Sequence, residues 1–126
     1  MSDAARWAAA FRQAWLKGDA EAAARLYAAD CVFRSHPFRE LEDARAYMRR
    51  VLPEAEAPEV WFGEPIEDGD RAAVEYWALF VEPDGTESTI AGCHVMRFDA
   101  DGLVAEARDY WSLEPGHRRP PETWGR

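Results

Sequence analysis

Three turn signals divide the second half of the chain into stretches that read as β-strands. Each turn combines Asp with Gly, which is typical of the connections between strands. The turns are Asp68-Gly69-Asp70, Pro83-Asp84-Gly85 and Asp99-Ala100-Asp101-Gly102. They predict strands near Val60–Ile66, Arg71–Val81, Ser88–Phe98 and Leu103–Trp111. This half of the chain is therefore expected to form a meander of long antiparallel strands.

The first half has helical periodicity instead. Apolar residues recur at offsets 0, 3, 4, 7 and 8 from Trp7 to Trp15, which is one face of an amphipathic helix. Gly18 is placed to end this helix, and Asp19 is placed to cap a second one that continues to near Asp30. Helices followed by a strand meander indicate an α+β fold rather than a βαβ fold.

A short strand and a third helix complete the first half. Cys31 to Ser35 reads as a strand, which Pro37 stops. Ala44, Tyr47, Met48 and Val51 then share a helical face, and Pro53 lies just past its end. The last residues, 113–126, form a Pro-rich tail that is expected to be loop-like.

Composition excludes several classes of protein. The chain has 126 residues and a formal charge of −9, so a basic surface for nucleic acid or anionic membrane is not expected. The longest apolar run is too short to cross a bilayer, and the first residues lack a signal-peptide pattern. Two cysteines without metal-ligand spacing suit a reduced, cytoplasmic protein with no metal.

Two-residue periodicity assigns side chains to the two faces of the sheet. One face is predicted to carry Glu75, Trp77, His94, Met96, Phe98, Asp109 and Trp111, and the other face to carry Tyr76, Cys93 and Tyr110. Both faces are largely apolar, while the helices can cover only one of them. We therefore expect the uncovered outer face to form a homodimer.

Several short motifs resemble the SnoaL-like, or polyketide cyclase-like, branch of the nuclear transport factor 2-like superfamily. They are Lys17-Gly18-Asp19, residues 26–30, Ser35-His36-Pro37-Phe38, residues 97–104 and Arg108-Asp109-Tyr110-Trp111. The resemblance covers roughly residues 4–112. It implies one SnoaL-like domain over residues 1–126, built as a cone-shaped α+β barrel. In such a cone, three N-terminal helices pack on a curved, mostly antiparallel sheet around an apolar pocket.

The resemblance marks Asp109 as the first catalytic candidate. In SnoaL-like cyclases and limonene-epoxide hydrolases, the aspartate of the matching stretch is catalytic. An aspartate among apolar neighbours has its charged form disfavoured, which suits general acid or base work. The alternative is a buried structural acid, paired with an arginine or a backbone amide. An Asp109 neutralised by a close arginine, with no open cavity touching it, would rule out the enzyme hypothesis.

Two histidines are further candidates. His94 faces the same way as Asp109 and looks equivalent to the oxyanion-binding acid of ketosteroid isomerases, so it could bond a substrate oxygen. It could equally be a core histidine bonded to Asp109 or Glu75. His36, just before Pro37, matches the position of the isomerase base approximately. It could serve as a base at the pocket rim or only fix its loop.

The chain also departs from these enzymes. Phe11 stands where the isomerases have a catalytic tyrosine, and Glu75 and Trp77 stand where epoxide hydrolases have an arginine and an aspartate. Scytalone dehydratases offer only an analogy for a set of His36, His94, Asp109 and Tyr27. Glu75 is either a second carboxyl in the cup or a salt-bridge partner of Arg34.

These features predict a cofactor-independent acid/base enzyme of isomerase, cyclase, dehydratase or hydrolase type. Its ligand would be a small, largely apolar, oxygen-bearing molecule of polyketide or steroid-like character. The alternatives are a non-catalytic small-molecule binding module and, less favoured, a protein-interaction scaffold. The predicted pocket wall is Phe11, Tyr27, Glu75, Trp77, Met96, Phe98 and Trp111, which are otherwise simple core residues.

Overall fold

A computed structural model describes all residues, 1–126, and has helices before a sheet as expected. The helices are α1 (Asp3–Lys17), α2 (Ala20–Ala24) and α3 (Ala44–Val51), followed by the 3₁₀ turn η1 (Leu52–Glu54). The strands are β1 (Tyr27–Arg34), β2 (Glu42–Asp43), β3 (Glu56–Phe62), β4 (Ile66–Asp68), β5 (Arg71–Val81), β6 (Glu87–Phe98) and β7 (Val104–Pro115).

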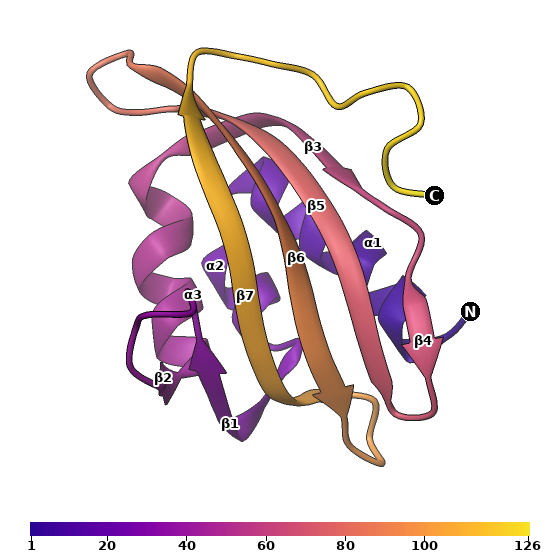
Figure 1. Cartoon of the computed structure of the whole chain (residues 1–126). Coiled ribbons are helices and arrows are strands. Elements are labelled where there is room, and N and C mark those ends of the chain that lie inside the picture. Colours follow the sequence, from indigo (N-terminus) through magenta and orange to yellow (C-terminus); the bar gives the residue numbers. More distant parts are fainter.

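All seven strands belong to one curved sheet. The strand order is β2-β1-β7-β6-β5-β3, with β4 paired to β5 beside this path. Every pairing is antiparallel except that of β1 with β7. Figure 1 shows the three helices behind one face of the sheet, which leaves the other face turned to the viewer. The predicted α+β cone of three helices on a mostly antiparallel sheet is confirmed.

The first helix begins and ends where its capping residues stand. The Ser2 side chain accepts a hydrogen bond from the Ala5 N–H, which satisfies one of the free donors of the first turn. Gly18 closes the helix with φ 66°, a left-handed conformation that costs glycine little. The amphipathic face from Trp7 to Ala14 is buried against the sheet, so the predicted helix is confirmed.

The second helix is much shorter than predicted. It ends at Ala24, and β1 begins at Tyr27 instead of continuing the helix to near Asp30. Tyr27 pairs with Val104 of β7, and the Val104 N–H donates to the Leu26 carbonyl. This pairing joins segments that are far apart in the chain, so helical spacing could not reveal it. The third helix agrees with the prediction, and Asp43 caps it.

The faces predicted for His94 on β6 and for Asp109 on β7 agree with the structure, whereas the face assigned to β5 is wrong by one residue. Val74 lies opposite His94, which lies opposite Asp109, so these three side chains share the inner face. Glu75 and Trp77 consequently lie on the outer face. Both sets of alternate residues on β5 are apolar, and such a pattern does not decide which one packs under the helices.

The C-terminal tail covers part of the outer face. In Figure 1 it leaves the end of β7 and runs back across the far end of the sheet toward β3. The Trp77 indole N–H donates to the Arg118 carbonyl, and Trp124 packs edge-to-face on Trp77 with centroids 5.9 Å apart. Thr89 bonds both Gly116 and Arg118. Trp124 thus packs against the outer face of the sheet.

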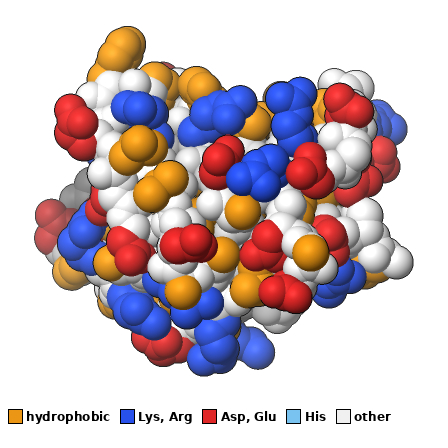
Figure 2. All heavy atoms as spheres, turned by 90° about the horizontal axis from the view of Figure 1, so that it is seen from below, with side chains coloured by type: hydrophobic (Ala, Val, Ile, Leu, Met, Phe, Trp, Pro, Cys, Tyr) orange, Lys and Arg blue, Asp and Glu red, His pale blue; other side chains and the backbone are white.

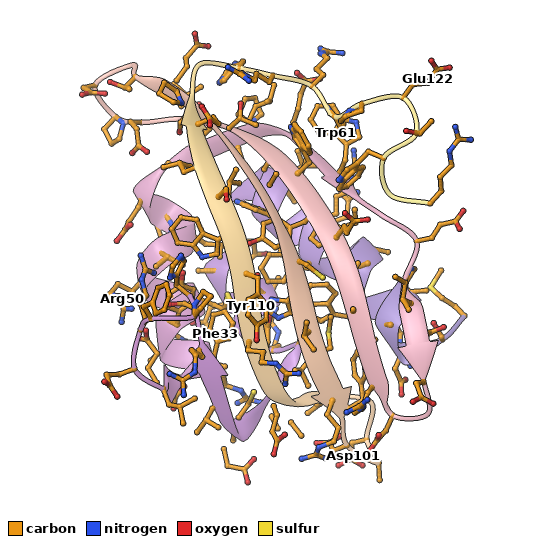
Figure 3. All side chains as sticks on the ribbon, in the orientation of Figure 1. Phe33, Arg50, Trp61, Asp101, Tyr110 and Glu122 are labelled. Carbon is orange, nitrogen blue, oxygen red and sulfur yellow. The ribbon has the colours of Figure 1, made fainter.

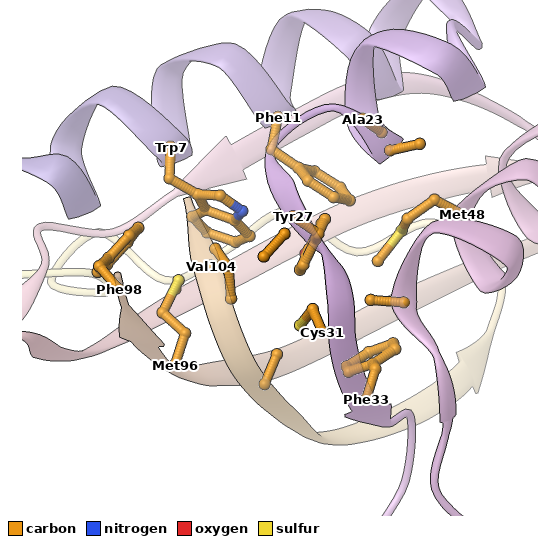
Figure 4. Close-up of a cluster of buried hydrophobic side chains, with 14 of the residues drawn as sticks. Trp7, Phe11, Ala23, Tyr27, Cys31, Phe33, Met48, Met96, Phe98 and Val104 are labelled. Atoms are coloured by element: carbon orange, nitrogen blue, oxygen red, sulfur yellow. The ribbon is translucent and has the colours of Figure 1, made fainter. Parts of the chain in front are cut away.

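The main core lies between the helices and the inner face of the sheet. Figure 4 shows Trp7 and Phe11 of α1 above Tyr27 and Phe33 of β1, with Met96 and Phe98 at one end of the cluster. On the face shown in Figure 2, basic and acidic side chains are interspersed. No helix of the structure is long and apolar enough to cross a membrane.

Candidate functional site

A cavity of about 280 Å³ opens between the helices and the inner face of the sheet. Aromatic and aliphatic side chains from α1, α3, β1, β3, β5, β6 and β7 form most of its wall. The larger ones are Trp7, Phe11, Trp15, Phe33, Met48, Phe62, Phe80, Ile90, Trp111 and Leu113. Arg39, Glu54 and Glu82 add charged groups. An apolar cavity with a few polar groups is the usual form of a small-molecule site.

The uncharged and acidic polar side chains of the cavity include Asp109, His94, Tyr76 and Tyr47. Asp109 Oδ1 accepts a hydrogen bond from the Tyr76 hydroxyl at 3.0 Å. The same oxygen lies 3.6 Å from His94 Nδ1, which is longer than a hydrogen bond but close enough for electrostatic attraction. The Asp109 side chain is 14% exposed, so it is mostly buried yet reachable from the cavity.

A glycine in the middle strand allows Tyr76 to reach Asp109. The two residues belong to β5 and β7, which are separated by β6. Gly92 of β6 lies opposite Tyr76 in the register, and a Cβ on Gly92 would stand 2.6 Å from the Tyr76 hydroxyl. The phenol ring therefore crosses β6 over the one residue that has no side chain.

We expect Gly92→Ala to break this contact. The added methyl group would also stand 2.6 Å from the Tyr110 carbonyl, which belongs to the neighbouring strand and cannot move freely. Overpacking of this kind costs about 1–3 kcal/mol, which chemical denaturation would measure. Gly85→Ala is not a matched control, because Gly85 has φ 87°. Ala91→Gly on the same strand is the better comparison, and an unchanged free energy of unfolding in Gly92→Ala would contradict the close packing.

His94 is held by aromatic rings on several sides. It is buried, stacks on Trp7 with centroids 4.8 Å apart and planes inclined by 10°, and contacts Phe33. Its Nε2 lies 3.0 Å from the Tyr27 hydroxyl. The ring is thus fixed between Tyr27 on one side and Asp109 on the other.

Burial keeps the tyrosines of this region protonated. Desolvation, followed by the negative charge of Asp109, raises the pKa of Tyr76 well above its usual value. The same two causes raise the pKa of the buried Tyr27 and, less strongly, of Tyr47. All three hydroxyls therefore remain hydrogen-bond donors at neutral pH.

Asp109 is open to the cavity and is not neutralised by an arginine. It lines the cavity, and no arginine lies within salt-bridge distance of it. Its contacts with hydrogen-bonding groups involve Oδ1 alone, so Oδ2 has no hydrogen-bond partner in the protein. A carboxylate with one oxygen held and the other free can act on a molecule in the cavity.

The structure brings some of the predicted site residues together and separates others. Phe11 and Trp111 line the cavity with Asp109 and His94. Tyr27 lies beneath His94 and does not reach the cavity wall. Three more predicted wall residues lie elsewhere: Met96 and Phe98 belong to the closed part of the core, while Trp77 lies under the tail.

Two other predicted site residues, His36 and Glu75, lie outside the cavity wall. His36 packs edge-to-face on Trp111 with centroids 4.9 Å apart, next to the cavity. Its Nδ1 also lies 3.5 Å from the Phe38 N–H, the loop contact weighed as its alternative role. Glu75 is exposed on the outer face and forms no salt bridge, so neither role considered for it is observed.

Several cavity residues are not identified by the sequence patterns. Tyr76 lies on the inner face, opposite to the predicted one, and the shared face of Tyr47 and Met48 predicts a helix but not a site. Arg39 follows the first strand and lies over the Trp111 ring, 5.3 Å from its centroid. The apolar spacing of α3 is a signal that could have identified Tyr47, whereas no local pattern identifies Arg39.

The curved sheet, the helices on its inner face and the cavity between them define a nuclear transport factor 2-like fold. The SnoaL-like domain model matches residues 8–107, and the chain belongs to that family. No curated protein matches the chain in sequence.

Solved structures share the fold at low sequence identity. The epoxide hydrolase/cyclase-like enzyme SalBIII, described in pyran ring formation in the polyether salinomycin, has a TM-score of 0.75 and 15% identity, covering 89% of this chain and 95% of that chain. A Δ5-3-ketosteroid isomerase from Mycobacterium sp. has a TM-score of 0.73 and 18% identity, with the same coverage. RV0760c from Mycobacterium tuberculosis, in complex with estradiol-17β-hemisuccinate, has a TM-score of 0.76 and 17% identity, covering 90% of this chain and 98% of that chain.

Proposed function

We propose that the protein is a cofactor-independent acid/base enzyme in which Asp109 is the catalytic carboxylate. The observation that carries this proposal is the state of its two oxygens. Oδ1 is held by Tyr76, whereas Oδ2 is free on a residue that lines the cavity. A structural carboxylate would be expected to have both oxygens satisfied by the protein.

The wall of the cavity supports a small, largely apolar ligand that carries at least one oxygen. Aromatic rings on α1, β3 and β7 offer flat surfaces to a fused or cyclic carbon skeleton. Tyr47 and Tyr76 add hydroxyl groups near Asp109. The steroid-type complex of RV0760c and the isomerase and cyclase-like activities of the other neighbours support a polyketide or steroid-like compound.

The proposed reaction begins with proton transfer from carbon. Asp109 Oδ2 takes a proton from a C–H bond next to a carbonyl group, and the electron pair of that bond forms an enolate. Tyr47 donates a hydrogen bond to the enolate oxygen, because its raised pKa keeps it protonated. In a β,γ-unsaturated ketone the enolate is a conjugated dienolate, and returning the proton to its γ-carbon gives the α,β-unsaturated isomer and restores the carboxylate. His36, at the rim beside Trp111, is proposed to assist proton movement there.

Deuterium exchange tests this proposal without knowledge of the natural substrate. A small apolar ketone such as 2-tetralone is incubated with the protein in D₂O, and mass spectrometry follows exchange next to the carbonyl. Faster exchange than in a matched solution of bovine serum albumin supports the enzyme. Tryptophan fluorescence measures binding of the same ketone in parallel. Binding without added exchange would favour the non-catalytic binding module.

We also propose that the outer face left open by the tail pairs with a second copy. Tyr110 and Ile66 are 44% and 72% exposed there, and Figure 3 shows Tyr110 on the face of the sheet away from the helices. Exposed apolar residues on a two-sided sheet favour self-association.

Light scattering should find a dimer for the wild type and a monomer for Tyr110→Glu, with Asp101→Glu as control. A monomeric wild type at high micromolar concentration would refute this assembly.

A further inference from the structure

Both ring nitrogens of His94 face groups of the protein. Nε2 lies 3.0 Å from the Tyr27 hydroxyl, and Nδ1 lies 3.6 Å from Asp109 Oδ1. The residue is 3% exposed, and Trp7 stacks on the face of its ring. His94 therefore has no free nitrogen to offer a ligand, although the ring contributes to the cavity wall.

The surroundings of Tyr27 decide which way its hydrogen bond with His94 runs. Tyr27 is completely buried, and His94 is the hydrogen-bond partner of its hydroxyl. The indole N–H of Trp7 is also buried and has no hydrogen-bond partner. In Figure 4 the indole nitrogen of Trp7 is turned toward Tyr27. The Tyr27 hydroxyl proton therefore has one acceptor in the protein, His94 Nε2.

The position of Asp109 agrees with this arrangement. A neutral imidazole carries one N–H, so an Nε2 that accepts from Tyr27 leaves the proton on Nδ1. That proton points toward the carboxylate. The reverse tautomer would place the Nδ1 lone pair against a negative oxygen and leave the Tyr27 proton without an acceptor.

We propose that Tyr27 is a positioning residue that holds His94 neutral with its proton on Nδ1, so that His94 supports the Asp109 carboxylate and does not itself contact the ligand. This rests on the proposed function only in giving Asp109 the catalytic role. The arrangement makes Tyr27 and Tyr76 complementary. One acts on Asp109 through His94, and the other donates to it directly.

Nitrogen-15 NMR of the intact chain tests the tautomer directly. The chain has three histidines, and comparison with His94→Gln assigns the His94 signals. At pH 7 we expect a protonated Nδ1 and an unprotonated, hydrogen-bonded Nε2, in at least about tenfold excess over the other tautomer. The Tyr27 hydroxyl proton should exchange slowly and show a cross-peak to Nε2. An Nε2–H tautomer or an imidazolium at this pH would overturn the proposal.

Tyr27→Phe then tests the donor. The Nε2 resonance should move toward that of a nitrogen without a hydrogen bond, while Tyr110→Phe, which removes a hydroxyl from the outer face, should leave it unchanged. An unmoved Nε2 resonance in Tyr27→Phe would also overturn the proposal, and if that variant does not fold, the wild-type tautomer decides. These spectra need no substrate. A failed ketone-exchange assay together with an Nδ1–H tautomer would therefore remove the enzyme and leave this arrangement standing.

Discussion

Asp109→Asn is expected to slow exchange of the ketone protons by about 10²–10⁴-fold, the usual contribution of a general base. The asparagine side chain has nearly the same shape but cannot take up a proton at neutral pH. Its amide oxygen can still accept the hydrogen bond from Tyr76, so this part of the cavity wall should keep its structure. The initial rate of deuterium incorporation measures the loss.

Two controls separate a lost base from a damaged fold. Asp101→Asn makes the same chemical change in an exposed turn and should exchange the ketone at the wild-type rate. Binding of the ketone, followed by tryptophan fluorescence, should change little in Asp109→Asn, because the apolar wall is untouched. If Asp109→Asn exchanges the ketone within about twofold of the wild-type rate, the loss is far smaller than the contribution of a general base. Another group would then be the base.

Trp7→Ala should be the most destabilising of the substitutions considered, with a loss of about 3–5 kcal/mol in the free energy of unfolding. Trp7 is 3% exposed and packs against Phe11, Phe62 and His94 at centroid distances from 4.8 to 5.4 Å. Removing its ring leaves a void where α1 meets the sheet and frees one face of His94. Urea denaturation followed by circular dichroism measures the effect.

Trp7→Phe keeps an aromatic ring but removes the indole N–H, which has no partner in good geometry. We expect it to cost much less than Trp7→Ala, because losing an unsatisfied buried donor offsets part of the lost packing. Trp124→Ala removes the same side chain from the tail, where it packs on Trp77 at the sheet surface. A Trp7→Ala loss no larger than that of Trp124→Ala would contradict the central place of Trp7 in the core.

Local signals predicted most of the elements, because caps and turns act over a few residues. Gly18 and Asp19 stand at helix ends as expected, and the turn at residues 83–85 joins β5 to β6. The predicted second helix is too long, because the segment after Ala24 has helical spacing but pairs with β7. Parallel pairing with a distant strand outweighed the local preference.

The candidate site was predicted in part for a similar reason. Asp109 and His94 lie in antiparallel strands joined by one hairpin, so alternation places both on the inner face. Tyr76 was missed because both faces of β5 are apolar. The outer face of β5 includes Trp77, which packs under the C-terminal tail. The spacing of residues within β5 does not predict that residues 116–124 cover this face.

The sequence by itself determined the order of helices and hairpins, the SnoaL-like resemblance and the pairing of His94 with Asp109 across two neighbouring strands. These features depend on short-range periodicity, capping and turn chemistry, which act within a helix or a hairpin. Only the tertiary structure decided which face of β5 turns inward, that Tyr76 crosses Gly92 to bond Asp109, and that Tyr27 lies against His94. Those contacts depend on how α1, β1 and the tail close over the sheet, and packing between distant segments is not encoded in the spacing of any one of them.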